Sequence, residues 1–86
     1  MEEEPNIGRI IKDVLHRQGR SITWLADELH YSRQNMYKIF TREWIHTDLL
    51  LKISIVMNHD FFKYFSDYQY NNKKELLIDD AFSNNV

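Results

Sequence analysis

The sequence predicts an all-α fold, a bundle of five helices, and three observations support this prediction. The only proline and both glycines lie at or before Gly19, so the rest of the chain lacks the residues that favour tight β-turns. Apolar residues recur three and four positions apart, which is the period of a helix. The chain has 86 residues, of which 43% are apolar, and this suffices for one domain with one small core.

The first two helices are expected between Asn6 and His30. Asn6 can cap the first helix, and Gly19 suits its C-terminal end. The apolar face of this helix consists of Ile7, Ile10, Ile11, Val14 and Leu15. Ser21 or Thr23 can cap a second helix of about two turns. Its inner side holds Leu25, Ala26 and Leu29, while Asp27 and Glu28 face outward.

The third and fourth helices follow with short connections. Ser32 can cap the third helix, whose apolar residues are Met36, Ile39 and Phe40. Thr47 or Asp48 can cap the fourth helix, which we expect to be the central buried one. Its inward stripe is Leu50, Ile53, Val56 and Met57, broadened by Leu49, Leu51 and Ile55.

A short fifth helix and a polar tail complete the chain. Asp60 can cap this helix, from which Phe61, Phe62, Phe65 and Tyr68 are expected to pack back on the bundle. Beyond Tyr70 the chain is polar apart from the patch Leu76-Leu77-Ile78. We therefore expect a folded domain over residues 5–70 and a flexible or weakly ordered tail over residues 71–86.

The charge distribution is uneven along the chain. The net charge is −2, from 11 basic and 13 acidic residues. Six of the acidic residues lie at the two ends, and removing them leaves seven against all 11 basic residues, a net charge of +4. The residues from Arg9 to Arg42 include seven basic and three acidic side chains. This middle segment could face a polyanion, although an ordinary mixed surface would also account for it.

The sequence lacks the residues that several classes of protein function require. An enzyme is not expected, because no phosphate-binding glycine loop or G-x-S-x-G motif occurs and the carboxylates do not converge in the sequence. No metal or other cofactor is expected, since the chain has no cysteine and the four histidines are far apart in sequence. No small-molecule ligand is inferred. No apolar run is long enough for a membrane span, so we expect a cytoplasmic protein.

The second and third helices are separated only by His30 and Tyr31, which is the arrangement that a helix-turn-helix requires. The inner faces of such a pair would be formed by Leu25, Leu29, Tyr31, Met36 and Ile39. Ala26 supplies a small residue where the two helices would cross.

The segments "WLADELHYSRQNMYKIF" and "TDLLLKISIVMNHDFF" resemble the helix-turn-helix family of the phage-repressor type, also called Xre or lambda Cro-like. The resemblance covers roughly residues 7–68 and implies a five-helix, lambda-repressor-like bundle. The pattern "WLA…YKIF…LLLKIS…HDFF" is also similar to small Bacteroides-type transcriptional regulators. His30 stands where the family usually has glycine, and histidine is tolerated in the left-handed conformation expected there. Trp44 and Ile45 stand in a loop that is commonly polar, and we expect Trp44 to be buried, as large aromatic residues usually are.

The resemblance implies sequence-specific binding of double-stranded DNA, with the third helix, about Ser32 to Phe40, in the major groove. The residues expected to read bases are Arg33, Gln34, Asn35, Tyr37 and Lys38. The residues expected to contact phosphate are Arg20, Ser21, Thr23, Ser32 and Arg42, with Arg17 as a further candidate. Such a regulator would be associated with the nucleoid.

One module of this size buries limited DNA surface, so we expect a homodimer on two half-sites. The candidate dimer surface is the fifth helix with its tail, represented by Phe62, Tyr64 and Tyr68. The main alternative is a protein-interaction module that keeps the fold without reading DNA. DNA reading requires Arg33, Gln34 and Lys38 to be exposed, whereas the alternative requires an exposed apolar patch around Trp44, Phe62 or Tyr68. RNA binding ranks third, since no sheet is expected.

Overall fold

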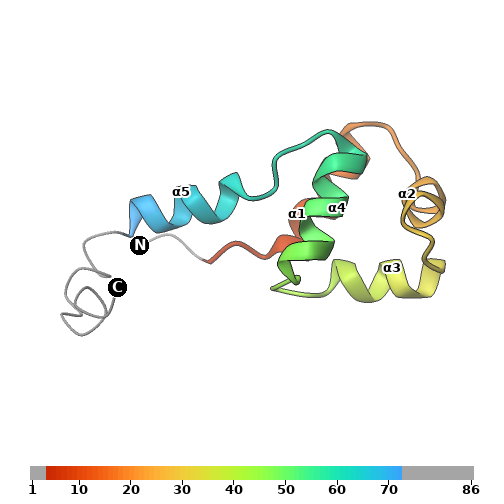
Figure 1. Cartoon of the computed structure of the whole chain (residues 1–86), viewed down its shortest axis with the longest axis horizontal. Coiled ribbons are helices and arrows are strands. Elements are labelled where there is room, and N and C mark those ends of the chain that lie inside the picture. The colour runs from red at the N-terminus through yellow and green to blue at the C-terminus, as the bar shows by residue number, and fades with distance from the viewer. Residues whose placement is uncertain (1–3, 73–86) are drawn as a thin grey trace.

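The structure, a computed structural model, describes residues 4–72, and this part of the chain is all-α, as predicted. Its helices are α1 (Ile7–Arg17), α2 (Ile22–Leu29), α3 (Arg33–Phe40), α4 (Thr47–Met57) and α5 (Lys63–Asn71). Figure 1 shows α1 and α4 at the centre, α2 and α3 on one side, and α5 extending from the other side. No helix within residues 4–72 is long and apolar enough to cross a membrane.

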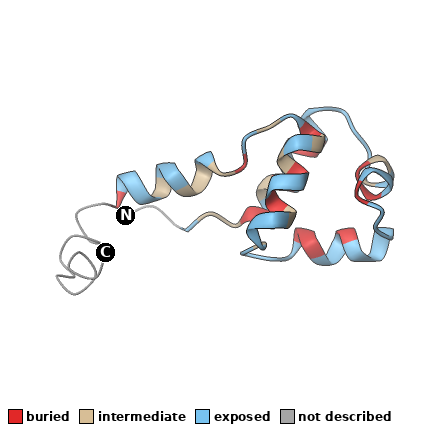
Figure 2. Ribbon diagram, in the orientation of Figure 1, coloured by how far each residue is buried: buried red, intermediate tan, exposed pale blue. Residues whose placement is uncertain are grey.

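The core is built by α1 to α4 together with Phe61, which follows α4. Figure 2 shows buried positions on each of these four helices. The buried apolar residues are Ile7, Ile11, Val14, Leu15, Leu25, Ala26, Leu29, Met36, Ile39, Phe40, Leu50, Ile53, Met57 and Phe61. Removing this much apolar surface from water is the main favourable contribution to folding.

Three predicted N-caps are confirmed. The side-chain oxygens of Asn6, Ser21 and Ser32 accept hydrogen bonds from the backbone N–H groups three residues later, at 3.3, 3.0 and 3.1 Å. Each bond satisfies one of the free N–H groups at a helix start. Of the two caps considered for α2, Ser21 is the one used, and Thr23 lies within the helix.

The predicted caps of α4 and α5 are wrong. Helix α4 begins at Thr47, after His46, and no side-chain cap is formed. Thr47 and Asp48 are already helical. The negative charge of Asp48 lies in the first turn, where it interacts favourably with the helix dipole. Asp60 accepts a hydrogen bond from the N–H of Phe62 at 3.0 Å, within the turn that precedes α5, so it lies too early to cap a helix that begins at Lys63.

The α2–α3 connection is a tight turn, as predicted. The N–H of Tyr31 donates to the carbonyl of Ala26 at 2.8 Å, and Ala26 is buried between the helices. His30 has φ 57° and ψ 39°, the left-handed conformation expected at this position. In Figure 1, α2 is seen end-on while α3 lies across the view, so their axes are steeply inclined. Tyr31, however, is 36% exposed, which corrects the prediction that it points inward.

Helix α1 meets the C-terminal end of α3 through Gly8, a contact that the sequence did not indicate. The N–H of Gly8 donates to the carbonyl of Arg42 at 2.9 Å. A Cβ at position 8 would lie 2.7 Å from the carbonyl oxygens of both Phe40 and Arg42. Only glycine therefore permits this approach, which fixes the end of α3 against the start of α1.

Helix α4 is buried along a narrower face than predicted. Leu50, Ile53 and Met57 are buried, and Leu49 and Val56 are half-buried. Leu51 and Ile55 are 51% and 70% exposed, so the prediction that they broaden the inward stripe is wrong. These two residues lie four positions apart on a side of α4 that no other described segment covers.

Helix α5 projects from the bundle and has no buried residue. Phe61 is fully buried, and Phe62 and Phe65 are half-buried and pack against the core, which confirms the prediction that these three residues pack back on the bundle. Tyr68 is half-buried. His59 bonds the Tyr64 hydroxyl through Nε2 at 2.8 Å, which joins the turn to the first part of α5. Helix α5 ends at Asn71, next to the predicted boundary at residue 70, and residues 73–86 of the predicted tail lie outside the described part.

Candidate nucleic-acid interface

Helix α3 has one buried face and one exposed face. Met36, Ile39 and Phe40 are buried against the rest of the bundle. All five residues predicted to read bases are exposed, namely Arg33, Gln34, Asn35, Tyr37 and Lys38. The hydrophobic contacts thus fix the helix, and its exposed side carries a continuous set of hydrogen-bonding groups.

Arg33 and Tyr37 form a pair one helical turn apart on the exposed side of α3. The Arg33 guanidinium donates a hydrogen bond from Nη2 to the Tyr37 hydroxyl at 3.1 Å, and its Cζ lies 5.9 Å from the ring centroid. The rings of Tyr37 and Phe40 form a T-shaped pair, with centroids 6.4 Å apart. Residues four positions apart on a helix are neighbours, so Tyr37 restricts the directions in which Arg33 can point.

Two basic residues of α1 lie beside this pair, and sequence reasoning did not include them in the site. A shallow depression between α1 and α3 is lined by Arg9, Lys12, Asp13, Tyr37, Phe40 and Thr41, so two positive charges and one negative charge surround it. Arg9 and Lys12 are three positions apart on the exposed side of α1, and this spacing is the signal that could have revealed them. They add positive charge next to the exposed face of α3.

The cations of α3 and its C-terminal end are not neutralised within the described part of the chain. Arg33, Lys38 and Arg42 are exposed, and no ion pair joins any of them to a carboxylate between residues 4 and 72. Because these cations form no internal ion pair, no such pair has to break before they can approach a phosphate.

The residues predicted to contact phosphate differ in their surroundings. The hydroxyl oxygens of Ser21 and Ser32 accept the capping hydrogen bonds of α2 and α3, which leaves their O–H groups as donors. Thr23 and Arg42 are exposed, and the side chain of neither is bonded within the described residues.

Arg20 has intramolecular partners instead. Its Cζ lies 4.1 Å above the centroid of the Trp24 ring, and its Nη1 donates to the carbonyl of Val56 at 3.4 Å, near the end of α4. A phosphate contact would compete with these interactions, which makes Arg20 the weakest member of the predicted phosphate set.

Large apolar side chains are also exposed outside α3. Trp44 is 66% exposed, so the prediction that it is buried is wrong. It belongs to the connection between α3 and α4. With Leu51 and Ile55 of α4, it is among the large apolar residues that this structure leaves in contact with solvent.

The remaining chemistry of the described residues is sparse. No group of three or more His, Cys, Asp or Glu side chains within residues 4–72 is placed to hold a metal ion.

Comparison of the sequence with models of protein families gives no match, and searches of characterised proteins and of solved structures give none either. A functional assignment therefore rests on the residues and their geometry.

Proposed function

We propose that this protein binds double-stranded DNA sequence-specifically, as a transcriptional regulator that inserts α3 into the major groove. The observation that carries the proposal is the exposed face of α3, where five hydrogen-bonding side chains project from a helix whose other face is buried. A protruding, well-anchored helix of this kind is what major-groove recognition uses. The resemblance of residues 7–68 to the phage-repressor helix-turn-helix family supports the same function.

The chemistry of α3 suits base recognition. Arg33 can donate two hydrogen bonds to O6 and N7 of guanine, and Gln34 or Asn35 can pair with N6 and N7 of adenine. Each good bidentate contact contributes discrimination of about 1–3 kcal/mol against the wrong base.

Phosphate contacts would supply the rest of the affinity. The hydroxyl groups of Ser21, Thr23 and Ser32 and the side chain of Arg42 are proposed as phosphate ligands, with Arg9 and Lys12 adding to the positive field beside α3. The intramolecular contacts of Arg20 reduce its expected share. Binding by this set is sequence-independent and weakens as salt rises.

We also propose that the active species is a homodimer. One module buries on the order of 600–1,000 Å² of its own surface against DNA, so two half-sites are needed for useful affinity and specificity. The proposed dimer surface is α5 with the preceding residue Phe62, because Phe62, Tyr64 and Tyr68 are only half-buried and the helix stands away from the bundle. The protein would then act at the nucleoid, in the cytoplasm.

A second candidate function is a protein-interaction module. The exposed side chains of Trp44 and Ile55, at 66% and 70%, favour it, because large apolar residues in contact with water are frequent in protein interfaces. These residues do not lie on α3, so the two functions predict different binding surfaces.

Selection from a randomised duplex library separates the two functions. If the protein is a sequence-specific regulator, the selection should enrich a two-fold-symmetric sequence with half-sites about one helical turn apart. The affinity for that sequence should fall steeply as the salt concentration rises. An Arg33→Ala, Gln34→Ala, Lys38→Ala variant should lose the enrichment. If the wild-type protein enriches no sequence and binds duplexes only weakly, the DNA-reading function is rejected in favour of the interaction module.

A further inference from the structure

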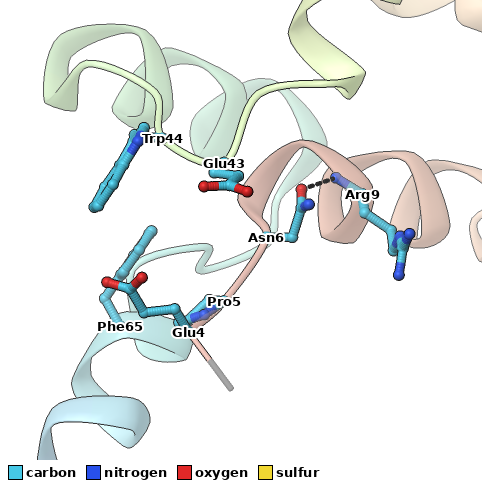
Figure 3. A pocket seen from close by; sticks show the side chains of 7 residues that line it. All are labelled: Glu4, Pro5, Asn6, Arg9, Glu43, Trp44 and Phe65. Atoms are coloured by element: carbon cyan, nitrogen blue, oxygen red, sulfur yellow. Dashed lines mark hydrogen bonds between the residues drawn. The ribbon is translucent and has the colours of Figure 1, made fainter.

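A small cavity lies between the N-terminal segment, the connection from α3 to α4, and α5. Its volume is about 200 Å³. Figure 3 shows Trp44 and Phe65 on one side of it, and the carboxylates of Glu4 and Glu43 nearby. None of these four residues belongs to the proposed DNA-reading face, so the cavity calls for a separate account.

Two aromatic rings form the apolar part of the cavity. Trp44 is 66% exposed and Phe65 is half-buried. No ring contact joins the two within the described residues, so space remains between them. The face of an aromatic ring carries a partial negative charge and attracts cations, and tryptophan does so most strongly.

Two carboxylates give the cavity a second attraction for cations. Glu4 and Glu43 both line it, and neither is engaged in an ion pair within residues 4–72. Arg9 lines the cavity too, but Figure 3 shows its guanidinium directed away from the space between Trp44 and Phe65. The positive charge of Arg9 therefore does not face the two rings.

The other tryptophan of this chain already has a cation on its ring. Arg20 lies 4.1 Å above the centroid of Trp24. Trp44 has no such partner among the described residues, although it is the more exposed of the two and has two carboxylates beside it. Of the two tryptophan rings, that of Trp24 is thus covered by an intramolecular cation, and that of Trp44 is open to a cation from outside.

We propose that this cavity binds an alkylammonium or alkylguanidinium group, held between the rings of Trp44 and Phe65 and neutralised by Glu4 and Glu43. Pockets for drug-sized ligands occupy about 300–1,000 Å³, so a cavity below that range fits the end of an alkyl cation rather than a nucleotide or a larger metabolite. The group is either part of a free polyamine or a basic side chain of another molecule. Because Phe65 belongs to α5 and Trp44 to the bundle, occupancy would join α5 to the rest of the protein.

The test is a titration of the full chain with n-butylammonium, followed through the two tryptophan indole N–H signals by NMR. A Trp24→Phe variant assigns the signals. The Trp44 signal should shift saturably, with half-saturation at roughly millimolar concentration, while the Trp24 signal serves as internal control. Neutral 1-butanol, which has a similar shape, should shift Trp44 much less. Equal shifts with the alcohol, or no saturable shift with the amine, would overturn the proposal.

Two variants test the residues that line the cavity. Phe65→Leu should weaken butylammonium binding by about twofold to fivefold, and Glu43→Gln by about fivefold. Glu28→Gln, which removes an exposed carboxylate of α2 outside the cavity, should leave the affinity unchanged. If Glu28→Gln weakens binding as much as Glu43→Gln does, binding reflects overall charge and the site is rejected.

A final comparison identifies the source of the cationic group. Tighter binding of a linear polyamine than of n-butylammonium would identify a free small molecule as the ligand. Tighter binding of a short peptide with one central lysine would identify a basic side chain of another protein. Each result supports the site, because both ligands present the same group to Trp44.

Discussion

Replacing Gly8 by alanine should destabilise the protein, even though alanine is the better helix former. The added Cβ would meet the carbonyl oxygens of Phe40 and Arg42 at 2.7 Å, and that of Ile39 still more closely. All three are backbone atoms at the end of α3, so no side chain can rotate out of the way. The start of α1 and the end of α3 must therefore move apart.

The magnitude follows from three contributions. Overpacking of a tight contact costs about 1–3 kcal/mol. Separation also weakens the 2.9 Å hydrogen bond from the N–H of Gly8 to Arg42, at a cost of about 1 kcal/mol. The higher helix propensity of alanine offsets about 1 kcal/mol of this loss of stability. The net expectation is a loss of about 2 kcal/mol, or a fall in Tm of about 10 °C for a domain of this size.

Thermal and urea unfolding, followed by circular dichroism, measures this loss. Gly19 provides the control, because it has φ 69° but nothing within 4 Å of its added Cβ. Gly19→Asn should remain close to the wild type, since asparagine tolerates the left-handed conformation, whereas Gly8→Asn should lose at least as much as Gly8→Ala. A Gly8→Ala protein with a Tm at or above that of the wild type would refute the reasoning.

Three further predictions concern single side chains. Ser32→Ala removes the cap of α3 and should cost about 1 kcal/mol, whereas Ser32→Asp should retain most of the stability; equal unfolding midpoints for the two variants would contradict the capping role. His30→Gly should raise the stability by about 1 kcal/mol in urea unfolding, because His30 has a positive φ; a loss would show that its side chain contributes. Burial lowers the pKa of His59 below 6.5, and the charges of Lys63 and Arg17 lower it further, while Asp60 opposes the change. Its contribution to stability is therefore complete above pH 6.5 and is lost as the pH falls through the lowered pKa, so the urea midpoint should drop more between about pH 8 and about pH 5 in the wild type than in His59→Asn. Identical drops in the two proteins would assign the effect to other groups.

The helix starts that depend on local chemistry could be predicted from the sequence. Asn6, Ser21 and Ser32 cap their helices because the acceptor and the N–H group that it satisfies are only three residues apart. His46 breaks this rule, since α4 begins after it without a side-chain cap. Its first turn is held by the hydrogen bond from the N–H of Leu50 to the carbonyl of His46 at 2.9 Å and by burial of the Leu50 side chain.

The exposure of individual apolar residues could not be predicted, because it depends on which segments cover them. Leu51 and Ile55 fit the helical pattern of α4 as well as Leu50 does, but they are 51% and 70% exposed. Trp44, in the connection between α3 and α4, is 66% exposed. Gly8 carries no visible signal in the sequence, since its importance comes from carbonyl groups more than thirty residues away.

The candidate DNA-reading site was predictable in its position and less so in its details. The exposure of Arg33, Gln34 and Lys38 follows from the pattern of apolar residues on α3. The hydrogen bond from Arg33 to Tyr37 is consistent with their spacing, but the contact of Arg20 with Trp24 depends on side-chain orientations that spacing does not fix. Arg9 and Lys12 join the site only because Gly8 brings α1 against α3.

The most direct test of the central claim compares two variants whose net charge is lower by two units. In Arg33→Ala, Lys38→Ala the change lies on α3, and in Lys52→Glu it lies on the exposed side of α4. The measured quantity is the ratio of affinities for a selected duplex and a random duplex at fixed salt. The α3 variant should lose at least about tenfold in this ratio, because one bidentate base contact contributes about 1–3 kcal/mol, and the control should keep it. Equal ratios in both variants and the wild type would contradict sequence reading by α3.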